Sequence, residues 1–294
     1  GLTETSLTSS IASAQAAITA FNVSDAEVKG DSTDIVNAIN DHSSNTFSGN
    51  FTITNNDYTL AELKSINDVT SGSITLLTTN VALSGNSSDL AAAFAGTVTT
   101  HTGTVTITNN DYTVAELKAI NGATTGAITL SDPSSNISGT SADIVLAFAA
   151  SGNGTAVTTN TGTVTISNGD YTVAQLKTIN AATTGAIILS DPSSNISGSS
   201  SDIVLAFAAS ANGTAVTTNT GTVTITNADY TLAELVTINA ATDGNLILSN
   251  TGVALSGTVA NFKSAFAGTV TTHTGSITIT DSNTTDITAT DITT

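Results

Sequence analysis

The chain has 294 residues, of which 23 are acidic and 5 are lysine, so its formal net charge is −18; arginine, cysteine, methionine and tryptophan are absent. This balance disfavours binding to nucleic acids or anionic membranes, because almost no cationic side chain is available to contact phosphates. The lack of cysteine excludes disulfides and thiolate chemistry, and no apolar run approaches the roughly 20 residues that span a bilayer. The chain begins with Gly1 and shows no signal-peptide pattern, so we interpret it as a mature or excised piece of a longer protein.

Residues 1–29 form a segment of their own at the N-terminus. The stretch from Thr8 to Phe21 is rich in alanine and amphipathic. This pattern predicts a helical cap or a degenerate copy of the repeat that follows.

A tandem repeat occupies most of the remaining chain. The tetrad Asp-Tyr-Thr-Leu/Val begins at Asp57, Asp111, Asp170 and Asp229, with spacings of 54, 59 and 59 residues. Residues 103–161 and 162–220 differ at only 9 of 59 positions. One unit is therefore used about four times, and a repeat of this size indicates a stacked architecture.

Each unit divides again into two similar halves, each with a helix followed by two strands. In one unit the first half has a helix over 112–121 and strands over 126–131 and 136–139, and the second half has a helix over 140–150 and strands over 156–159 and 162–167. The predicted repeat region covers 30–280, with half-units at about 30–54, 57–85, 86–108, 111–139, 140–167, 170–198, 199–226, 229–257 and 258–280.

Capping patterns locate the short helices. The helix that follows each tetrad begins with a capping box, in which Thr is followed three residues later by Glu or Gln, as in Thr59 and Glu62 or Thr172 and Gln175. The second helix begins with a small polar residue followed three later by Asp, as in Thr140 and Asp143. Because these helices have only about two turns, we expect stacking to stabilise them.

The strands alternate apolar residues with threonine, as in 103–108 and 162–167. The segments 126–131 and 185–190 are more continuously apolar, which predicts deeper burial. The expected fold is a β-rich solenoid with a short helix in each coil. The alternative is a string of small α+β modules built from hairpins, such as 156–159 with 163–167.

The last residues, 281–294, are rich in Thr, Asp and Ile and carry no helix signal. Because the end of a solenoid is an exposed sheet edge, we expect this segment to be an extension into a further unit or a strand that pairs with another subunit.

The residue types for catalysis are scarce. His42, His101 and His273 are the only histidines, and Asn160 and Asn219 stand at the positions equivalent to His101 and His273. A catalytic base would not be replaced by Asn in half of the copies, so we interpret these residues as structural. Zinc binding and a Ser-His-Asp triad are disfavoured for the same reason, and we expect no enzyme, catalytic residue or cofactor-binding residue.

Calcium is the one metal that the acidic residues suggest. The tetrad residues Asp57, Asp111, Asp170 and Asp229 lie in oxygen-rich turns that resemble the surroundings of calcium ligands. Neither an EF-hand loop nor a Gly-Gly-x-Gly-x-Asp nonapeptide is present. The favoured interpretation is a turn or cap role for each aspartate, with calcium as the alternative.

The near-identical 59-residue units, the richness in Thr, Asn and Asp, the acidic charge and the absence of cysteine resemble the repeat regions of large secreted bacterial surface proteins, including the extenders of adhesins. The resemblance implies a secreted, cell-surface or matrix location. We therefore expect a structural repeat protein, either a subunit of a filament or matrix that binds copies of itself end to end or laterally, or the stalk of an adhesin. The alternative is a module whose Thr, Asn or Tyr rows bind polysaccharide, ice or a host surface; a polysaccharide lyase or hydrolase is a third hypothesis.

Overall fold

The computed structural model describes residues 27–41, 46–150, 157–209 and 216–281. These residues form two compact units. Unit 1 holds the described residues up to Thr108 together with 122–129, and unit 2 holds 109–121, 130–150 and the described residues from 157 onward. The predicted N-terminal cap and the predicted C-terminal extension lie almost entirely outside the described residues.

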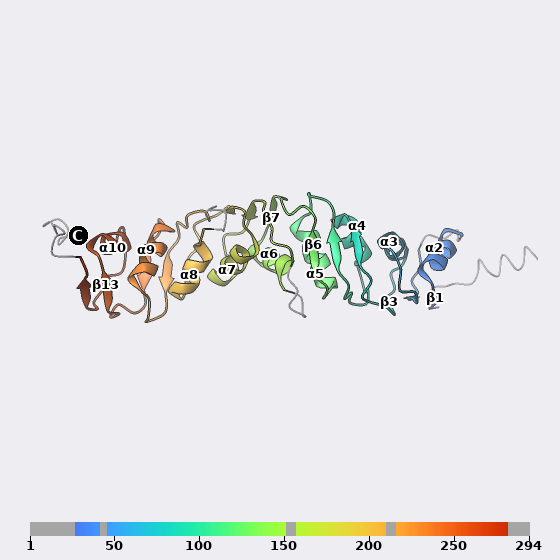
Figure 1. Cartoon of the computed structure of the whole chain (residues 1–294), viewed down its shortest axis with the longest axis horizontal. Helices are drawn as coiled ribbons and strands as arrows, with labels where there is room; N and C mark the ends of the chain where they lie inside the picture. Colours follow the sequence, from blue (N-terminus) through green and yellow to red (C-terminus); the bar gives the residue numbers. More distant parts are fainter. Residues whose placement is uncertain (1–26, 42–45, 151–156, 210–215, 282–294) are drawn as a thin grey trace, which may run out of the picture. The chain divides into compact units, whose positions relative to one another are not determined.

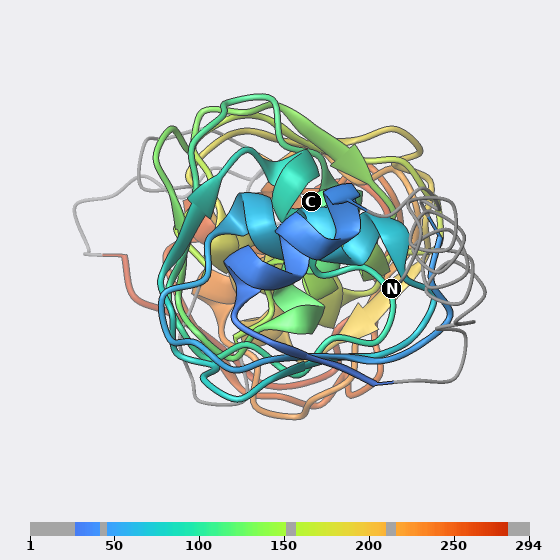
Figure 2. The same cartoon turned by 90° about the vertical axis from the view of Figure 1, so that its right-hand side faces the viewer.

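Unit 1 alternates three-residue strands with helices of seven to ten residues (Figure 1). Its elements are β1 (Val28–Gly30), α2 (Ser32–Asp41), β2 (Phe51–Ile53), α3 (Leu60–Val69), β3 (Ile74–Leu76), β4 (Leu83–Gly85), α4 (Ser87–Ala93) and β5 (Val105–Ile107). In Figure 2 the extended blue and teal segments of this unit curve around its row of helices.

Two elements contain the boundary between the units, and unit 2 then continues the same alternation. The boundary elements are α5 (Val114–Ala123) and β6 (Ile128–Leu130). The elements of unit 2 are β7 (Ile137–Gly139), α6 (Ser141–Phe148), β8 (Val164–Ile166), α7 (Val173–Ala182), β9 (Ile187–Leu189), β10 (Ile196–Gly198), α8 (Ser200–Phe207), β11 (Val223–Ile225), α9 (Leu232–Ala240), β12 (Leu246–Leu248), β13 (Leu255–Gly257), α10 (Val259–Ala265) and β14 (Ile277–Ile279).

The helices fall into two sets. The A helices (α3, α5, α7 and α9) follow the tetrads, and the B helices (α2, α4, α6, α8 and α10) lie between them in the sequence. Within unit 2, α7 packs against both α6 and α8, and α9 packs against both α8 and α10. Successive helices therefore cover one another's apolar faces, as their short length requires.

The strands pair in parallel in small sheets with the orders β1-β2-β3, β4-β5-β6, β7-β8-β9, β10-β11-β12 and β13-β14. In the sheet of β10, β11 and β12, Val223 pairs with Leu246, 23 residues later. The hairpin alternative is not observed for 163–167, because β8 pairs in parallel with β7 and β9. Helices prefer neighbours about 8–10 Å apart, whereas paired strands lie about 4.8 Å apart. Regular pairing stops after at most three strands, and the third strand is continued by an isolated parallel bridge, as from Ile187 to Val216.

The predicted caps are confirmed in detail. Thr59 and Glu62 form a reciprocal capping box at α3, and Thr172 with Gln175 and Thr231 with Glu234 do the same at α7 and α9. At the B helices, the side chain of Asn86, Thr140 or Ser199 accepts the N–H of the Asp three residues later. Local hydrogen bonding therefore fixes where each helix begins.

The core consists of alternate strand residues and one face of each helix. Val164 and Ile166 of β8 and Leu176 and Ile179 of α7 are all at most 1% exposed. The expectation that 185–190 is more deeply buried than the alternating strands is wrong, because Ile188 is 44% exposed between buried neighbours. A strand places alternate residues on opposite faces whatever their identity.

The chain is thus built from repeated helix-strand-strand units whose strands pair in parallel in small sheets.

Candidate functional site

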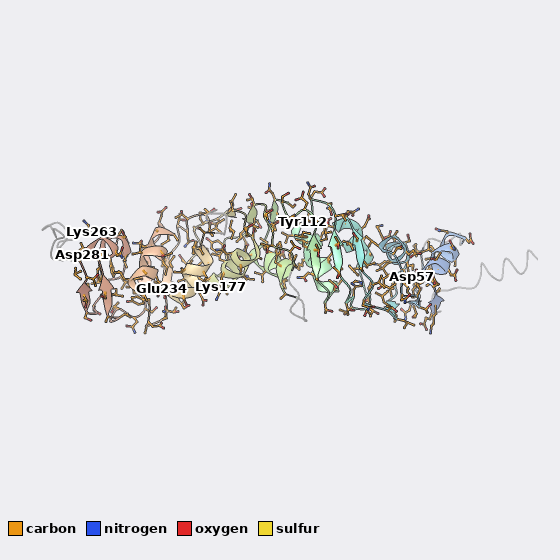
Figure 3. All side chains as sticks on the ribbon, in the orientation of Figure 1. Asp57, Tyr112, Lys177, Glu234, Lys263 and Asp281 are labelled. Atoms are coloured by element: carbon orange, nitrogen blue, oxygen red, sulfur yellow. The ribbon has the colours of Figure 1, made fainter. Side chains whose placement is uncertain are left out.

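The four tetrad aspartates lie on the surface, and each accepts a hydrogen bond from an asparagine two residues earlier. Figure 3 labels the first of them, Asp57. The distance from the Asn Nδ2 to the Asp Oδ1 is 2.8 Å at Asp57, 2.6 Å at Asp111 and 2.7 Å at Asp229, and Asn168 makes the same contact with Asp170. The contact recurs in every copy of the tetrad, which indicates one shared role.

That role is visible in what the asparagine does with its other atoms. Asn168 Oδ1 accepts the backbone N–H of Ser141 at 2.7 Å, and its Nδ2 also donates to Ser141 Oγ at 3.1 Å. Ser141 is the first residue of α6, so Asn168 satisfies an N–H that has no partner within the helix. The Asp170 carboxylate can only accept hydrogen bonds, so the amide group of Asn168 must point its Nδ2 toward this carboxylate. The amide oxygen Oδ1 of Asn168 then points toward the first residue of α6.

The calcium candidates therefore have a structural partner in each repeat. Asn55 and Asn227 hold the first residues of α2 and α8 in the same way. Among the described residues, no group of three or more His, Cys, Asp or Glu side chains is arranged to bind a metal ion. The geometry assigns these aspartates to fixing the cap of the preceding B helix.

Capping residues also link neighbouring helices through their side chains. The Glu62 carboxylate accepts hydrogen bonds from Thr33 Oγ1 at 2.7 Å and Ser32 Oγ at 3.1 Å, both in the first turn of α2. Burial pushes the pKa of Glu62 upward, but hydrogen bonds from Thr59, Thr33 and Ser32 outweigh burial and lower it. One capping box therefore serves two helices.

His101, Asn160, Asn219 and His273 occupy equivalent positions in successive repeats and are here called the corner residues. The first three of them are fully buried. His101 Nε2 lies 2.8 Å from the carbonyl oxygen of Val81, and burial lowers the pKa of this imidazole, which favours its neutral form. His273 Nε2 makes the equivalent contact with the carbonyl oxygen of Val253 at 2.7 Å. Both histidines fill a turn of the backbone, and neither lies in a group of metal-ligating side chains.

The tyrosine of each tetrad changes its partner with the corner residue. Tyr112 Oη donates to Asn160 Oδ1 at 2.8 Å, and Tyr171 makes the same contact with Asn219 at 3.0 Å (Figure 3 labels Tyr112). Where the corner residue is His, the hydroxyl instead donates to a backbone carbonyl, as Tyr58 does to Thr78 at 3.0 Å.

The sequence carries a signal for this exchange that went unnoticed. The tyrosine precedes an Asn corner by 48 residues and a His corner by 43, so the two repeat lengths carry different corner residues.

All four tyrosines, at positions 58, 112, 171 and 230, are 1% exposed. Burial raises the pKa of Tyr58, Tyr112 and Tyr171 to about 12. A strip of tyrosines can bind sugars only if solvent reaches the rings. The hypothesis that this chain binds polysaccharide, ice or a host surface therefore depends on its Thr and Asn rows and not on its tyrosines.

A second asparagine row caps the C-termini of the B helices. Asn180, near the end of α7, donates from Nδ2 to the carbonyl oxygens of Leu205, Ala206 and Ala208, at 3.0, 3.1 and 2.9 Å. Equivalent triplets are made by Asn67, Asn121 and Asn239. Sequence reasoning missed this role, although an Ile-Asn pair recurs in every A helix.

Ion pairs join neighbouring helices in two repeats. Lys118 Nζ lies 2.5 Å from Asp143 Oδ1, and Lys177 makes the same contact with Asp202. The lysine hydrogen bond is the main cause that lowers the pKa of each aspartate. In the last repeat both positions differ, with Val236 in place of Lys and Asn261 in place of Asp. Helices α9 and α10 of that repeat form without the ion pair, so the pair is not required for the fold.

Two of the surface grooves among the described residues of unit 2 bear on function. One, of about 560 Å³, is lined by 169–173 and 193–197, with Asp170 as its one acidic residue. It therefore lacks the two carboxylates that glycoside hydrolysis requires. The other, of about 390 Å³, lies between α10 and β14 and is lined mostly by apolar side chains.

Comparisons with family models, curated proteins and solved structures found no match for this chain. In the part of the chain that the structure describes, no helix has the length and apolarity to cross a membrane.

Proposed function

We propose that this chain is a non-enzymatic structural repeat protein of a bacterial surface, a subunit of a filament or matrix or the stalk of an adhesin. We further propose that its half-repeats continue as one β-solenoid with a helix in each coil. The observation that carries the proposal is that the polar side chains at the repeated positions form hydrogen bonds to helices of neighbouring half-units. Asp170 orients Asn168, which caps α6, and Asn180 caps α8.

The electrostatics support the same role. The resolved carboxylate pKa values are lowered by nearby hydrogen-bond donors, mostly serine, threonine and lysine. A general acid needs the opposite shift, toward neutral pH, which burial or a second carboxylate would produce.

Small-angle scattering of the dilute protein tests the solenoid. A compact domain of 294 residues has a radius of gyration of about 19 Å. Coils that stack in one direction predict a value well above this and a length distribution typical of a rod. A radius near that of a compact domain would refute the continuous stack. Electron microscopy of the concentrated protein then distinguishes filaments from separate rods.

A second candidate function is a module that binds polysaccharide, ice or a host surface. It is favoured by the hydroxyl pairs on the outward positions of the sheets, such as Ser138 beside Thr165 and Ser197 beside Thr224. In two sheets the next outward residue is Ile188 or Ile247, which interrupts a continuous hydroxyl row. A glycan array and an ice-recrystallisation assay test this candidate, and binding in either would favour it.

A further inference from the structure

One of the asparagines that cap a B helix is followed by glycine. Asn168 holds the first residue of α6 and precedes Gly169, whereas the equivalent asparagines at 55, 109 and 227 precede Asn or Ala. In an Asn-Gly pair the backbone nitrogen of the glycine can approach the side-chain amide of the asparagine closely, because glycine has no Cβ to obstruct it. The chemistry open to Asn168 therefore differs from that of its equivalents.

The cap itself polarises the amide of Asn168. Its Oδ1 accepts the backbone N–H of Ser141 at 2.7 Å, and Ser141 is the first residue of α6, where the helix dipole favours negative charge. Attack of a nitrogen on Asn168 Cγ would place negative charge on this same oxygen. A donor that is already in position where charge develops lowers the barrier to such a reaction. The Ser141 N–H is thus placed as an oxyanion donor.

The attacking nitrogen and the solvent are both within reach. Gly169 is exposed, and its backbone N–H makes no hydrogen bond to any of the described residues. Gly169 also lines the groove of about 560 Å³ formed by 169–173 and 193–197, so water reaches this peptide bond. The Asp191 carboxylate lies against Gly169 where another residue would have its Cβ, which explains why this turn holds a glycine.

We infer that Asn168 and Gly169 form a site at which the chain modifies itself. The Gly169 nitrogen loses its proton to water or hydroxide and bonds to Asn168 Cγ, the Cγ–Nδ2 bond breaks, and ammonia leaves with a proton taken from solvent. Water then opens the resulting succinimide ring at either of its carbonyl groups. One opening gives aspartate at position 168 and the other gives an isoaspartyl linkage, so the reaction consumes only water.

The product cannot form the same cap. Asn168 Nδ2 donates to Asp170 Oδ1, and this bond loses its donor when the amide becomes a carboxylate. The new carboxylate also faces that of Asp170, and like charges in contact repel each other. The modification therefore loosens one junction between half-units, that of α6 with the turn after β8, and the change is irreversible.

The chain contains its own reference for this reaction. Asn121 also precedes a glycine, Gly122, but both lie inside α5, where the helix uses the backbone N–H and Asn121 Nδ2 donates to three carbonyl oxygens. The remaining Asn-Gly pairs, at 153 and 212, lie outside the described residues. In urea the fold acts on none of these pairs, so the rate in the folded chain divided by the rate in urea measures what the fold contributes at each site.

The test incubates the purified full chain at neutral pH, folded and in urea, and follows deamidation and isoaspartate at each site by peptide-mapping mass spectrometry. We expect the folded-to-urea ratio of rates to exceed one at Asn168 and to be at least about 10-fold lower at Asn121. A ratio below one at Asn168 would show that the cap protects the amide, and it would overturn the inference. The converted chain is expected to melt at a lower temperature than the fresh chain, and equal melting would refute the loosened junction.

Two variants of Ser141 separate the oxyanion donor from the rest of the site. Ser141→Pro removes the N–H, and proline suits this position because it is the first of the helix and Thr140 before it has a ψ of 151°. Ser141→Ala keeps the N–H and loses the same hydroxyl. We expect deamidation at Asn168 to be at least about 10-fold slower in the proline variant than in the alanine variant. Equal rates in two folded variants would refute the role of the N–H.

A double variant keeps the test decisive if Ser141→Pro does not fold. Gly169→Ala/Asp191→Asn reproduces the residues of the next copy, Ala228 and Asn250, so its turn is compatible with the fold. We expect this variant to lose deamidation at Asn168 while Asn121 keeps its wild-type rate. Deamidation that continues unchanged at Asn168 would contradict the proposed site. Because the reaction needs only water, every outcome leaves the structural role of the chain to its own tests.

Discussion

The asparagine at the end of α7 is the sharpest test of how one repeat stabilises the next. Asn180 Nδ2 contacts three carbonyl oxygens near the end of α8, at 2.9 to 3.1 Å, and shares two N–H groups among them. Each hydrogen bond contributes a net stability of about 1 kcal/mol, and leaving a carbonyl unpaired adds a desolvation cost. We expect Asn180→Ala to lower the free energy of unfolding by about 2–3 kcal/mol.

Asn180→Asp separates hydrogen bonding from packing, because it keeps the shape and replaces the donor with a negative acceptor. The carboxylate would face the negative end of the α8 dipole, which costs up to about 1 kcal/mol more than Ala at pH 7. Its folded pKa is therefore raised. This extra cost is complete above that raised pKa and disappears below the unfolded value of about 3.9.

Urea unfolding followed by circular dichroism measures both variants at pH 7 and pH 3. Thr178→Ala is the control, since Thr178 lies on the exposed face of the same helix and is expected to change stability by less than about 0.5 kcal/mol. The reasoning fails if Asn180→Ala is as stable as the control. It also fails if the aspartate variant is no less stable than the alanine variant at pH 7.

Three further predictions use thermal or urea unfolding of single variants. Tyr112→Phe removes a buried hydroxyl bonded at 2.8 Å and should cost about 1–2 kcal/mol; an unchanged melting curve would contradict this role. Gly185→Ala would put its Cβ against a neighbouring backbone carbonyl and should cost more than about 3 kcal/mol, whereas Gly122→Ala, in an open helical position, should stabilise by about 0.5–1 kcal/mol. Because burial lowers the pKa of His101, the stability it contributes is present above about pH 6.5 and is lost as the pH falls through its folded pKa; His101→Gln should flatten that part of the profile.

Local patterns predicted the helices well because they are set by neighbouring residues. The capping boxes at Thr59, Thr172 and Thr231 formed where the sequence placed them. The alternation of strands was equally readable, but burial was wrong at Ile188, where apolar composition was given more weight than strand periodicity. The strand predicted over 156–159 was also wrong, because its described residues make only an isolated bridge at Val157. Patterns of three or four residues are enough to define these features.

Contacts between repeats could not be read in the same way. Asn180 meets its carbonyls 25 to 28 residues away, and nothing in its own helix identifies that target. The exchange between Asn160 and His101 was visible in the sequence, but the change of tyrosine partner that accompanies it was not. Aligning the repeats finds which side chains recur, but only coordinates show which backbone atoms they meet.

The capping scheme has a consequence for how such a chain changes length. Each of these asparagines caps a helix in an adjacent half-unit. If two copies of the repeat are exchanged at equivalent positions, each asparagine therefore still has an equivalent helix to cap. Residues 103–161 and 162–220 are nearly identical, and recombination between the segments that encode them would add or remove 59 residues at a time. The product would have the same junctions as its parent, so the number of repeats can change without any new contact between repeats.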